Sequence, residues 1–318
     1  MLLSRTYSTI IVVMNLKLSY TAVPEDGSKP VKLILKYRLG LSERLIKRLK
    51  YADQVLCNSV PVYVDHRVKP GDVIEALVEF DEQNENIIPE EIGIDVLYED
   101  ESLIAVNKQP GLVVHPTAYH PSGTIANALA FRQRQKGVSS LIRPVSRLDR
   151  GTSGIIVFAA NQYVQEKLIR QMSDGTYRKE YIGIVHGIMA EKNGRISLPI
   201  ARKPGSIMLR EINAAGAPSV TCYELIEAFR GASCLRFELE TGRTHQIRVH
   251  CQAIGHALVG DTLYPSLVEG MEVIESDIDR QALHSYRTSF VHPLTGRPLE
   301  LTAPLPDDIL RLLEILRK

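Results

Sequence analysis

The spacing of hydrophobic and polar residues predicts helices near both ends of the chain. Apolar residues at helical spacing between positions 31 and 50 indicate two short helices, which break at Gly40 and resume after Ser42, a typical N-cap. Three more stretches with helical character are residues 124–135, 164–172 and 307–317. The chain therefore opens and closes on amphipathic helices.

Apolar runs bounded by turn residues predict strands through the middle of the chain. A hairpin is expected at residues 54–62, and the Lys-Pro-Gly-Asp turn at 69–72 opens another strand. Later strands are expected at residues 95–98, 103–107, 177–187, 219–229 and 232–239, and twice within 283–306. Residues 195–218 have little periodicity and carry several basic residues, which is typical of an exposed loop.

Chain length and one polar interval predict two domains. A length of 318 residues exceeds the usual size of a single domain, and the acidic interval 81–92 suits a linker. We expect a small domain at residues 14–80 and a larger one at 93–318. Residues 1–13 are a tail or a misassigned start, because their apolar run is too short for a membrane span or a secretory signal.

Composition favours a folded protein of the cytoplasm. Hydrophobic residues make up 44% of the chain and charged residues 24%. The four cysteines contain no Cys-x-x-Cys pair and are too few for a disulfide framework. A reducing compartment therefore fits best.

Positive charge is concentrated in one segment, although the net charge is only +1. Residues 31–50 contain seven basic residues against the single acid Glu43. The candidates for binding phosphate groups are Lys32, Lys36, Arg44, Lys47 and Arg48. A helix with one apolar and one basic face can pack on its own domain and offer phosphates the other face. The alternative is an ordinary solvated helix surface.

The order of basic helix pair, hairpin and Lys-Pro-Gly-Asp turn resembles the S4-type RNA-binding domain over roughly residues 30–80. That resemblance implies a small α/β domain that binds RNA. Ser59 stands where that family usually has glycine, so the hairpin turn is expected to be less regular.

The stretch from 143 to 154 carries the most conspicuous chemistry. Asp149 lies between Arg147 and Arg150, directly before a Gly-Thr-Ser-Gly turn that leads into an apolar run. Turn glycines allow a loop to present one side chain at a fixed angle. A carboxylate kept ionised by a guanidinium suits a nucleophile or base, and a surface ion pair is the alternative.

Several enzyme classes lack support in the sequence. No phosphate-binding glycine loop is present, which argues against nucleotide triphosphate or dinucleotide enzymes. His245 and His250 are five residues apart, which on a strand or a helix points them in different directions and argues against a metal site. The central motif supplies one carboxylate, whereas a glycosidase needs two.

Residues 147–154, Arg-Leu-Asp-Arg-Gly-Thr-Ser-Gly, resemble the central signature of the RluA family of RNA pseudouridine synthases. Other stretches agree in the family's order, at residues 107–116, 179–187, 241–261, 281–284 and 303–306. Two positions depart from the family pattern: Ser146 replaces a histidine, and Gln109 replaces the commoner proline.

The resemblance implies an α+β catalytic domain, in which helices and loops flank a central, mostly antiparallel mixed sheet. It implies that Asp149 is the catalytic aspartate, and that Arg243 holds it ionised. Tyr181 would stack on the uracil and is a candidate for removing its ring proton. Arg147 would fill the gap that the flipped nucleotide leaves, and Leu148 and Ile247 would line or support the pocket.

The implied partner is RNA, with ribosomal RNA favoured and transfer RNA possible as the substrate. No metal and no organic cofactor is implied, because the isomerisation is redox-neutral, and we expect a monomer that does not bind membranes. Two alternatives stay open. One is a non-catalytic RNA-binding or ribosome-assembly protein, and the other is a hydrolase that releases uracil.

Overall fold

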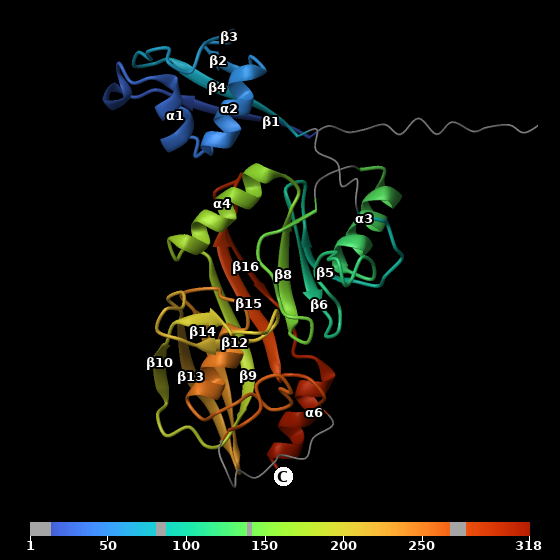
Figure 1. Ribbon diagram of the computed structural model, residues 1–318. Helices are drawn as coiled ribbons and strands as arrows, with labels where there is room; N and C mark the ends of the chain where they lie inside the picture. Colours follow the sequence, from blue (N-terminus) through green and yellow to red (C-terminus); the bar gives the residue numbers. More distant parts are fainter. Residues whose placement is uncertain (1–13, 81–86, 139–141, 268–277) are drawn as a thin grey trace, which may run out of the picture.

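The computed structural model describes residues 14–80, 87–138, 142–267 and 278–318 (Figure 1). The predicted tail at 1–13 and residues 81–86 of the predicted linker lie outside these ranges. Residues 87–92 contain no helix or strand. None of the helices within the described ranges combines the length and apolarity that a membrane span requires.

The N-terminal residues form a four-stranded antiparallel sheet in the order β1-β4-β2-β3. Its strands are β1 (Met14–Thr21), β2 (Val55–Cys57), β3 (Val60–Pro61) and β4 (Val73–Phe80). Beside it, after a short 3-10 helix η1 (Pro24–Asp26), lie helices α1 (Val31–Tyr37) and α2 (Glu43–Tyr51). The break at Gly40 and the cap are confirmed, because Ser42 accepts a hydrogen bond of 3.2 Å from the Leu45 amide.

The rest of the chain is built on a ten-stranded sheet, with main path β10-β13-β14-β9-β15-β8-β6-β5. Its strands are β5 (Asp95–Glu99), β6 (Leu103–Lys108), β7 (Arg143–Pro144), β8 (Ser153–Ala159), β9 (Arg178–His186), β10 (Asn193–Ser197), β13 (Val220–Phe229), β14 (Ala232–Leu239), β15 (Leu283–Val291) and β16 (Pro298–Thr302). Every pairing is antiparallel except that of β15 with β8. The predicted α+β fold with a mostly antiparallel mixed sheet is confirmed.

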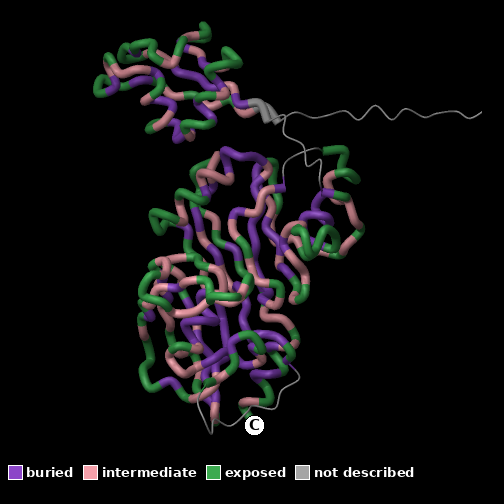
Figure 2. The backbone as a smooth tube through the Cα atoms, in the orientation of Figure 1, coloured by how far each residue is buried: buried purple, intermediate pink, exposed green. Residues whose placement is uncertain are grey.

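Four helices pack against this sheet, and its central strands are buried (Figure 2). They are α3 (Ile125–Lys136), α4 (Gln162–Ser173), α5 (Gln246–Ala253) and α6 (Asp307–Leu316). The helices predicted at 124–135, 164–172 and 307–317 correspond to α3, α4 and α6. All seven residues of β8 are buried, which explains their continuous apolar sequence.

The prediction of a loop at residues 195–218 is wrong in part. The segment includes the end of β10 and a small hairpin of β11 (Ile200–Arg202) and β12 (Arg210–Ile212). Strands of three residues are too short to show a period in the sequence. Ile200 of this hairpin packs with Val249 of α5 and with Tyr264.

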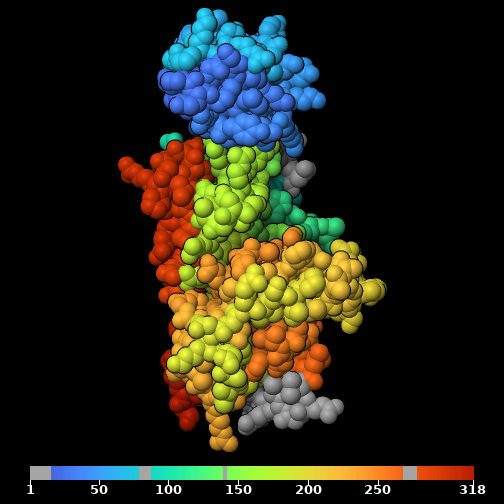
Figure 3. Space-filling view, turned by 90° about the vertical axis from the view of Figure 1, so that its left-hand side faces the viewer, coloured from blue at the N-terminus to red at the C-terminus, as the bar shows by residue number. Residues whose placement is uncertain are grey.

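Helix α4 is also in contact with the N-terminal elements (Figure 3). The Tyr163 hydroxyl donates to the Leu39 carbonyl at 3.0 Å, and the Ser42 hydroxyl donates to Glu166 at 3.1 Å. Buried residues of α1, α2 and α4 belong to one continuous hydrophobic cluster. The two sheets are therefore joined by a packed interface as well as by the chain.

Candidate active site

Asp149 lies in the loop that joins β7 to β8, and this loop is held by its backbone carbonyls. Lys108 Nζ donates to the Arg150 carbonyl at 2.9 Å, and Arg280 Nη1 donates to the Gly151 carbonyl at 2.8 Å. The Thr152 amide closes the turn on the Asp149 carbonyl at 3.1 Å. The backbone is therefore fixed at Asp149 and directly after it, which limits where its carboxylate can lie.

Gly154 shows why this loop needs glycine. Its φ of +102° belongs to a conformation that L side chains rarely adopt, and a Cβ there would collide with the backbone of Ser285. The start of β8 thus lies against β15, at the parallel pairing of the sheet. This close approach sets where the Asp149 loop leaves the sheet.

Lys108 is a fully buried support of the same loop, with 1% exposure. Its Nζ donates to the carbonyls of Gln109, Leu112 and Arg150 at 3.0, 3.0 and 2.9 Å. Burial lowers the pKa of Lys108 to about 7. Three carbonyl acceptors nevertheless match the three N–H donors of an ammonium group, and they favour the charged form.

The Asp149 carboxylate is paired with Arg248, whose Nη1 lies 3.1 Å from Oδ2. The same guanidinium makes two bonds of 2.7 Å to Asp261, from Nε to Oδ2 and from Nη2 to Oδ1. Arg248 also lies over the Tyr264 ring, with 5.0 Å from Cζ to the ring centroid. A bidentate partner that is itself buried leaves the guanidinium one orientation, so Asp149 meets a fixed positive charge.

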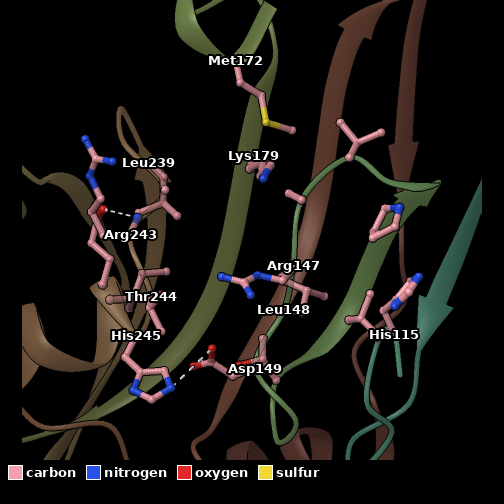
Figure 4. A pocket seen from close by; sticks show the side chains of 18 of the residues that line it. His115, Arg147, Leu148, Asp149, Met172, Lys179, Leu239, Arg243, Thr244 and His245 are labelled. Atoms are coloured by element: carbon pink, nitrogen blue, oxygen red, sulfur yellow. Dashed lines mark hydrogen bonds and ion pairs between the residues drawn. The ribbon is translucent and has the colours of Figure 1, made fainter. Parts of the chain in front are cut away.

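His245 is on the other side of the carboxylate, with Nε2 at 3.8 Å from Asp149 Oδ1 (Figure 4). It precedes α5 with a φ of 57°, an unusual conformation for a residue other than glycine. Its Nδ1 lies 2.8 Å from the Tyr264 hydroxyl. The turn before α5 therefore directs an imidazole at Asp149.

These groups line a pocket of about 1140 Å³, which extends from Asp149 to the C-terminal half of α4. Strand β9 contributes Lys179 and Tyr181 to its wall, because residues two apart on a strand lie on the same face. Tyr181 is 5% exposed, and burial with the nearby Tyr177 raises its pKa, so the phenol is neutral at neutral pH. Burial lowers the pKa of Lys179 to about 8.

One group of potential metal ligands occurs among the described residues, and it lies outside this pocket. Cys57, His66 and Asp72 of the N-terminal sheet region have ligand atoms within 4.8 Å of one another. The Asp72 carboxylate already accepts hydrogen bonds from the Lys69 amide and the Asn58 side chain. These contacts satisfy the carboxylate without an ion.

Comparisons with known proteins identify the family of this chain. The family described as RNA pseudouridylate synthase matches residues 102–253. An uncharacterized RNA pseudouridine synthase of Bacillus subtilis, YjbO, is 38% identical over 279 residues, which are 87% of this chain and 95% of that protein. Ribosomal large subunit pseudouridine synthase D of Pasteurella multocida is 38% identical over 258 residues, 79% of each chain.

The chain belongs to the RNA pseudouridine synthase family. Solved structures share its fold: human RNA pseudouridylate synthase domain containing 4 superposes with a TM-score of 0.57 at 20% identity, over 70% of this chain and 93% of that one. Human RNA pseudouridylate synthase domain containing 1 superposes with a TM-score of 0.53 at 23% identity, over 72% of this chain and 96% of that one. The synthase is thus an isomerase whose substrate is RNA.

The synthase brings most of the predicted site residues to one pocket. Asp149, Tyr181, Arg147, Leu148, Ile247 and Arg243 all line it. Arg147 is exposed and directed into the pocket in Figure 4. Leu148 and Ile247 also belong to the hydrophobic cluster beneath Tyr181, so each combines lining with core packing.

The predicted pairing of Arg243 with Asp149 is wrong. Arg243 is exposed, its Nε donates to the Pro218 carbonyl at 3.3 Å, and its side chain points away from Asp149 (Figure 4). It lies in the turn before α5, whereas Arg248 is on the inner face of the helix beside Ile247. Residues 246–253 gave no helical prediction. Buried apolar residues at helical spacing, Ile247 and Cys251, were the signal that could have identified Arg248.

The predicted RNA-binding residues of the N-terminal helices differ in their surroundings. Lys32 and Lys36 pair with Glu43 at 2.9 and 3.0 Å. Arg44 and Lys47 are exposed on α2, and within the described ranges they have no ion-pair partner. Arg48 is half-buried. The single acid of this segment therefore offsets part of the charge on the α1 side, and the unpaired positive charge lies on α2.

Proposed function

We propose that this synthase converts specific uridines of large-subunit ribosomal RNA to pseudouridine, with Asp149 as the essential carboxylate. The observation that carries the proposal is the geometry of Asp149, a partly exposed carboxylate on a rigid loop, paired with a buried arginine and facing a pocket. The choice of ribosomal RNA rests on the similarity to large-subunit synthases such as that of Pasteurella multocida.

The reaction breaks the bond between uracil N1 and ribose C1′ and forms one between C5 and C1′. The proton on C5 leaves and N1 gains one, so no electrons are exchanged. Arg248 places a fixed positive charge beside the Asp149 carboxylate, which is the attacking or proton-accepting group. The uracil enters the pocket only after it leaves its helix, and Arg147 fills the vacated place, which offsets part of the unstacking cost of a few kcal/mol.

Tyr181 provides the flat surface against which the uracil stacks. Its raised pKa keeps the phenol protonated at neutral pH, which disfavours the role of base that the sequence suggested for it. The N-terminal elements, as an S4-like domain, hold the RNA through the exposed cations of α2. Loops and distorted helices are the expected targets, because their bases leave the stack at lower cost.

The test is incubation of the purified protein with transcripts of large-subunit ribosomal RNA and of transfer RNA, followed by chemical mapping of pseudouridine. We expect product at discrete uridines of the ribosomal transcript and none with Asp149→Asn. RNA binding without product on any transcript would support the non-catalytic alternative. Free uracil among the products would identify a hydrolase.

A further inference from the structure

The hydrogen bonds around His245 favour one of its two neutral tautomers. The Arg210 amide donates to the Tyr264 hydroxyl oxygen at 2.9 Å, so the phenol keeps its own O–H for donation. Its acceptor among the described residues is His245 Nδ1, at 2.8 Å. We assign Nδ1 as the acceptor of this bond, which places the proton of the neutral ring on Nε2, the atom that faces Asp149.

The imidazole is neutral in the free enzyme. Burial is the main influence and lowers the pKa of His245; the Asp149 charge opposes this, and the Arg248 charge adds to it. A neutral ring with Nδ1 occupied offers the pocket one hydrogen-bond donor. Asp149, as an ionised carboxylate, offers acceptors only.

The backbone of His245 sets the direction of its side chain. Its left-handed φ of 57° costs free energy in a residue with a Cβ. The Thr241 hydroxyl and the Arg243 amide both donate to Gln246 Oε1, at 2.8 and 3.0 Å, and these bonds hold the turn. The strained conformation places the imidazole at the carboxylate.

We propose that His245 Nε2–H and the Asp149 carboxylate together bind the 2′-hydroxyl of the target uridine, an inference that rests on the proposed function. The two atoms are 3.8 Å apart, so one oxygen can lie about 2.8 Å from both. The group that fits a donor and an acceptor at once is a hydroxyl. An internal uridine of RNA has a single hydroxyl, at C2′, whereas its base carbonyls only accept and its N3–H only donates.

His245 is then a specificity-determining residue that distinguishes RNA from DNA at the reacting nucleotide. The target hydroxyl donates to Asp149 and accepts from His245, which also fixes the ribose relative to the carboxylate. Tyr264 is a positioning residue, since it acts through His245 and has no contact of its own with the ribose in this arrangement.

The test uses RNA oligonucleotides that contain either uridine or 2′-deoxyuridine at the one mapped target position. Pseudouridine formation is measured for the wild type and for His245→Ala on both substrates. We expect the missing hydroxyl to lower kcat/KM of the wild type by a factor roughly tenfold larger than the factor for His245→Ala, because the alanine variant keeps only the Asp149 bond to the hydroxyl. Any intrinsic chemical effect of the hydroxyl is common to both proteins and cancels in the ratio.

Three further variants sharpen the test. Tyr264→Phe removes the hydroxyl that fixes the ring, and it should weaken the discrimination between the substrates. His245→Gln retains an amide donor, so it should discriminate better than His245→Ala, and it serves if the alanine variant is unfolded. His120→Ala, which alters an exposed histidine outside the pocket, should match the wild type.

Equal losses for the wild type and His245→Ala would overturn the proposed contact, as would a wild type indifferent to the hydroxyl. These outcomes require product from the wild type on the all-ribose substrate. Absence of that product on every RNA counts against the proposed function instead, so the two failures are distinguishable.

Discussion

The buried arginine of the pocket and the exposed basic residues of α2 differ in exposure, in partners and in freedom of orientation. Arg248 is 5% exposed, is bound by two carboxylates and has one orientation. Arg44 and Lys47 project from α2 into solvent. A buried cation held by two carboxylates fixes geometry, because salt hardly screens it. Exposed cations serve attraction, which is long-ranged, sensitive to salt and tolerant of orientation.

The largest effect is expected at Asp149, which pairs with the buried Arg248. Asp149→Asn should lower the rate of pseudouridine formation by more than about 1000-fold, because the amide has no negative charge to supply. The RNA dissociation constant should stay within about threefold of wild type, since α2 and the pocket walls are unchanged. Single-turnover assays and filter binding measure the two quantities. A parallel loss of binding would mean that the carboxylate is structural.

Arg248 and Arg243 provide a matched pair that tests the corrected assignment. Arg248→Met leaves the buried Asp261 without its cation and should cost about 3–5 kcal/mol of unfolding free energy as well as activity. Arg243→Ala should stay within about 0.5 kcal/mol of wild type, because this side chain is exposed. Urea unfolding measures both.

A second change separates the structural from the catalytic part of the Arg248 effect. Replacing both partners, as Arg248→Met with Asp261→Leu, should restore much of the stability and none of the activity. If Arg243→Ala instead lowered activity more than Arg248→Met, the pairing of Asp149 with Arg248 would be irrelevant to function.

His284, a buried histidine behind the Asp149 loop, should make the unfolding free energy depend on pH. Burial lowers the pKa of His284 from 6.5 to about 4, and the ring bonds Ser153 Oγ at 2.9 Å. Between these pH values the unfolded chain binds one proton more, so stability falls as pH falls. The contribution, about 3 kcal/mol at 1.36 kcal/mol per unit, is complete above pH 6.5 and lost as pH falls through 4.

Urea unfolding at pH 7 and pH 4.5 checks this expectation. The stability difference between wild type and His284→Gln should be larger at pH 7. His120→Gln, a change at an exposed histidine, should keep the pH dependence of the wild type. A constant difference between wild type and His284→Gln would show that the proton is not linked to folding at this site.

The exposed group should respond to salt instead of pH. Replacing Arg44 and Lys47 with glutamine should reduce the slope of log affinity against log salt by about 1.5, since each phosphate contact contributes roughly 0.7–0.9. The same change at Lys32 and Lys36 should have a smaller effect, because Glu43 already offsets these charges. Equal effects of the two double variants would remove the distinction between α1 and α2.

The smallest expected effect is at the hairpin turn between β2 and β3. Ser59 has a φ of 66°, which costs a side chain roughly 1 kcal/mol. Ser59→Gly removes this strain, and the greater entropy of glycine in the unfolded chain offsets part of the gain. The net stabilisation should be about 0.5 kcal/mol. Ser19→Gly, in the extended conformation of β1, is the control and should destabilise it. Thermal unfolding measures both.

Sequence reasoning succeeded where the physics is local. The cap at Ser42 and the presentation of Asp149 by a glycine-containing turn both follow from neighbouring residues. It failed where the partner is remote. Arg248 pairs with Asp149 from 99 residues away, and Asp261 completes the group only after α5 folds. The spacing of Ile247 and Cys251 is the one local sign that α5 places Arg248, and not Arg243, inside.

Helix α4 has contacts on two sides. Tyr163 and Glu166 contact the N-terminal elements, and Ile169 and Met172 line the pocket. Its 12 residues span about 18 Å at 1.5 Å per residue. If RNA binds to α2 and inserts a uridine at Asp149, α4 sets the distance between the binding contact and the reacting nucleotide. Target choice would then depend partly on this distance, which is independent of base sequence.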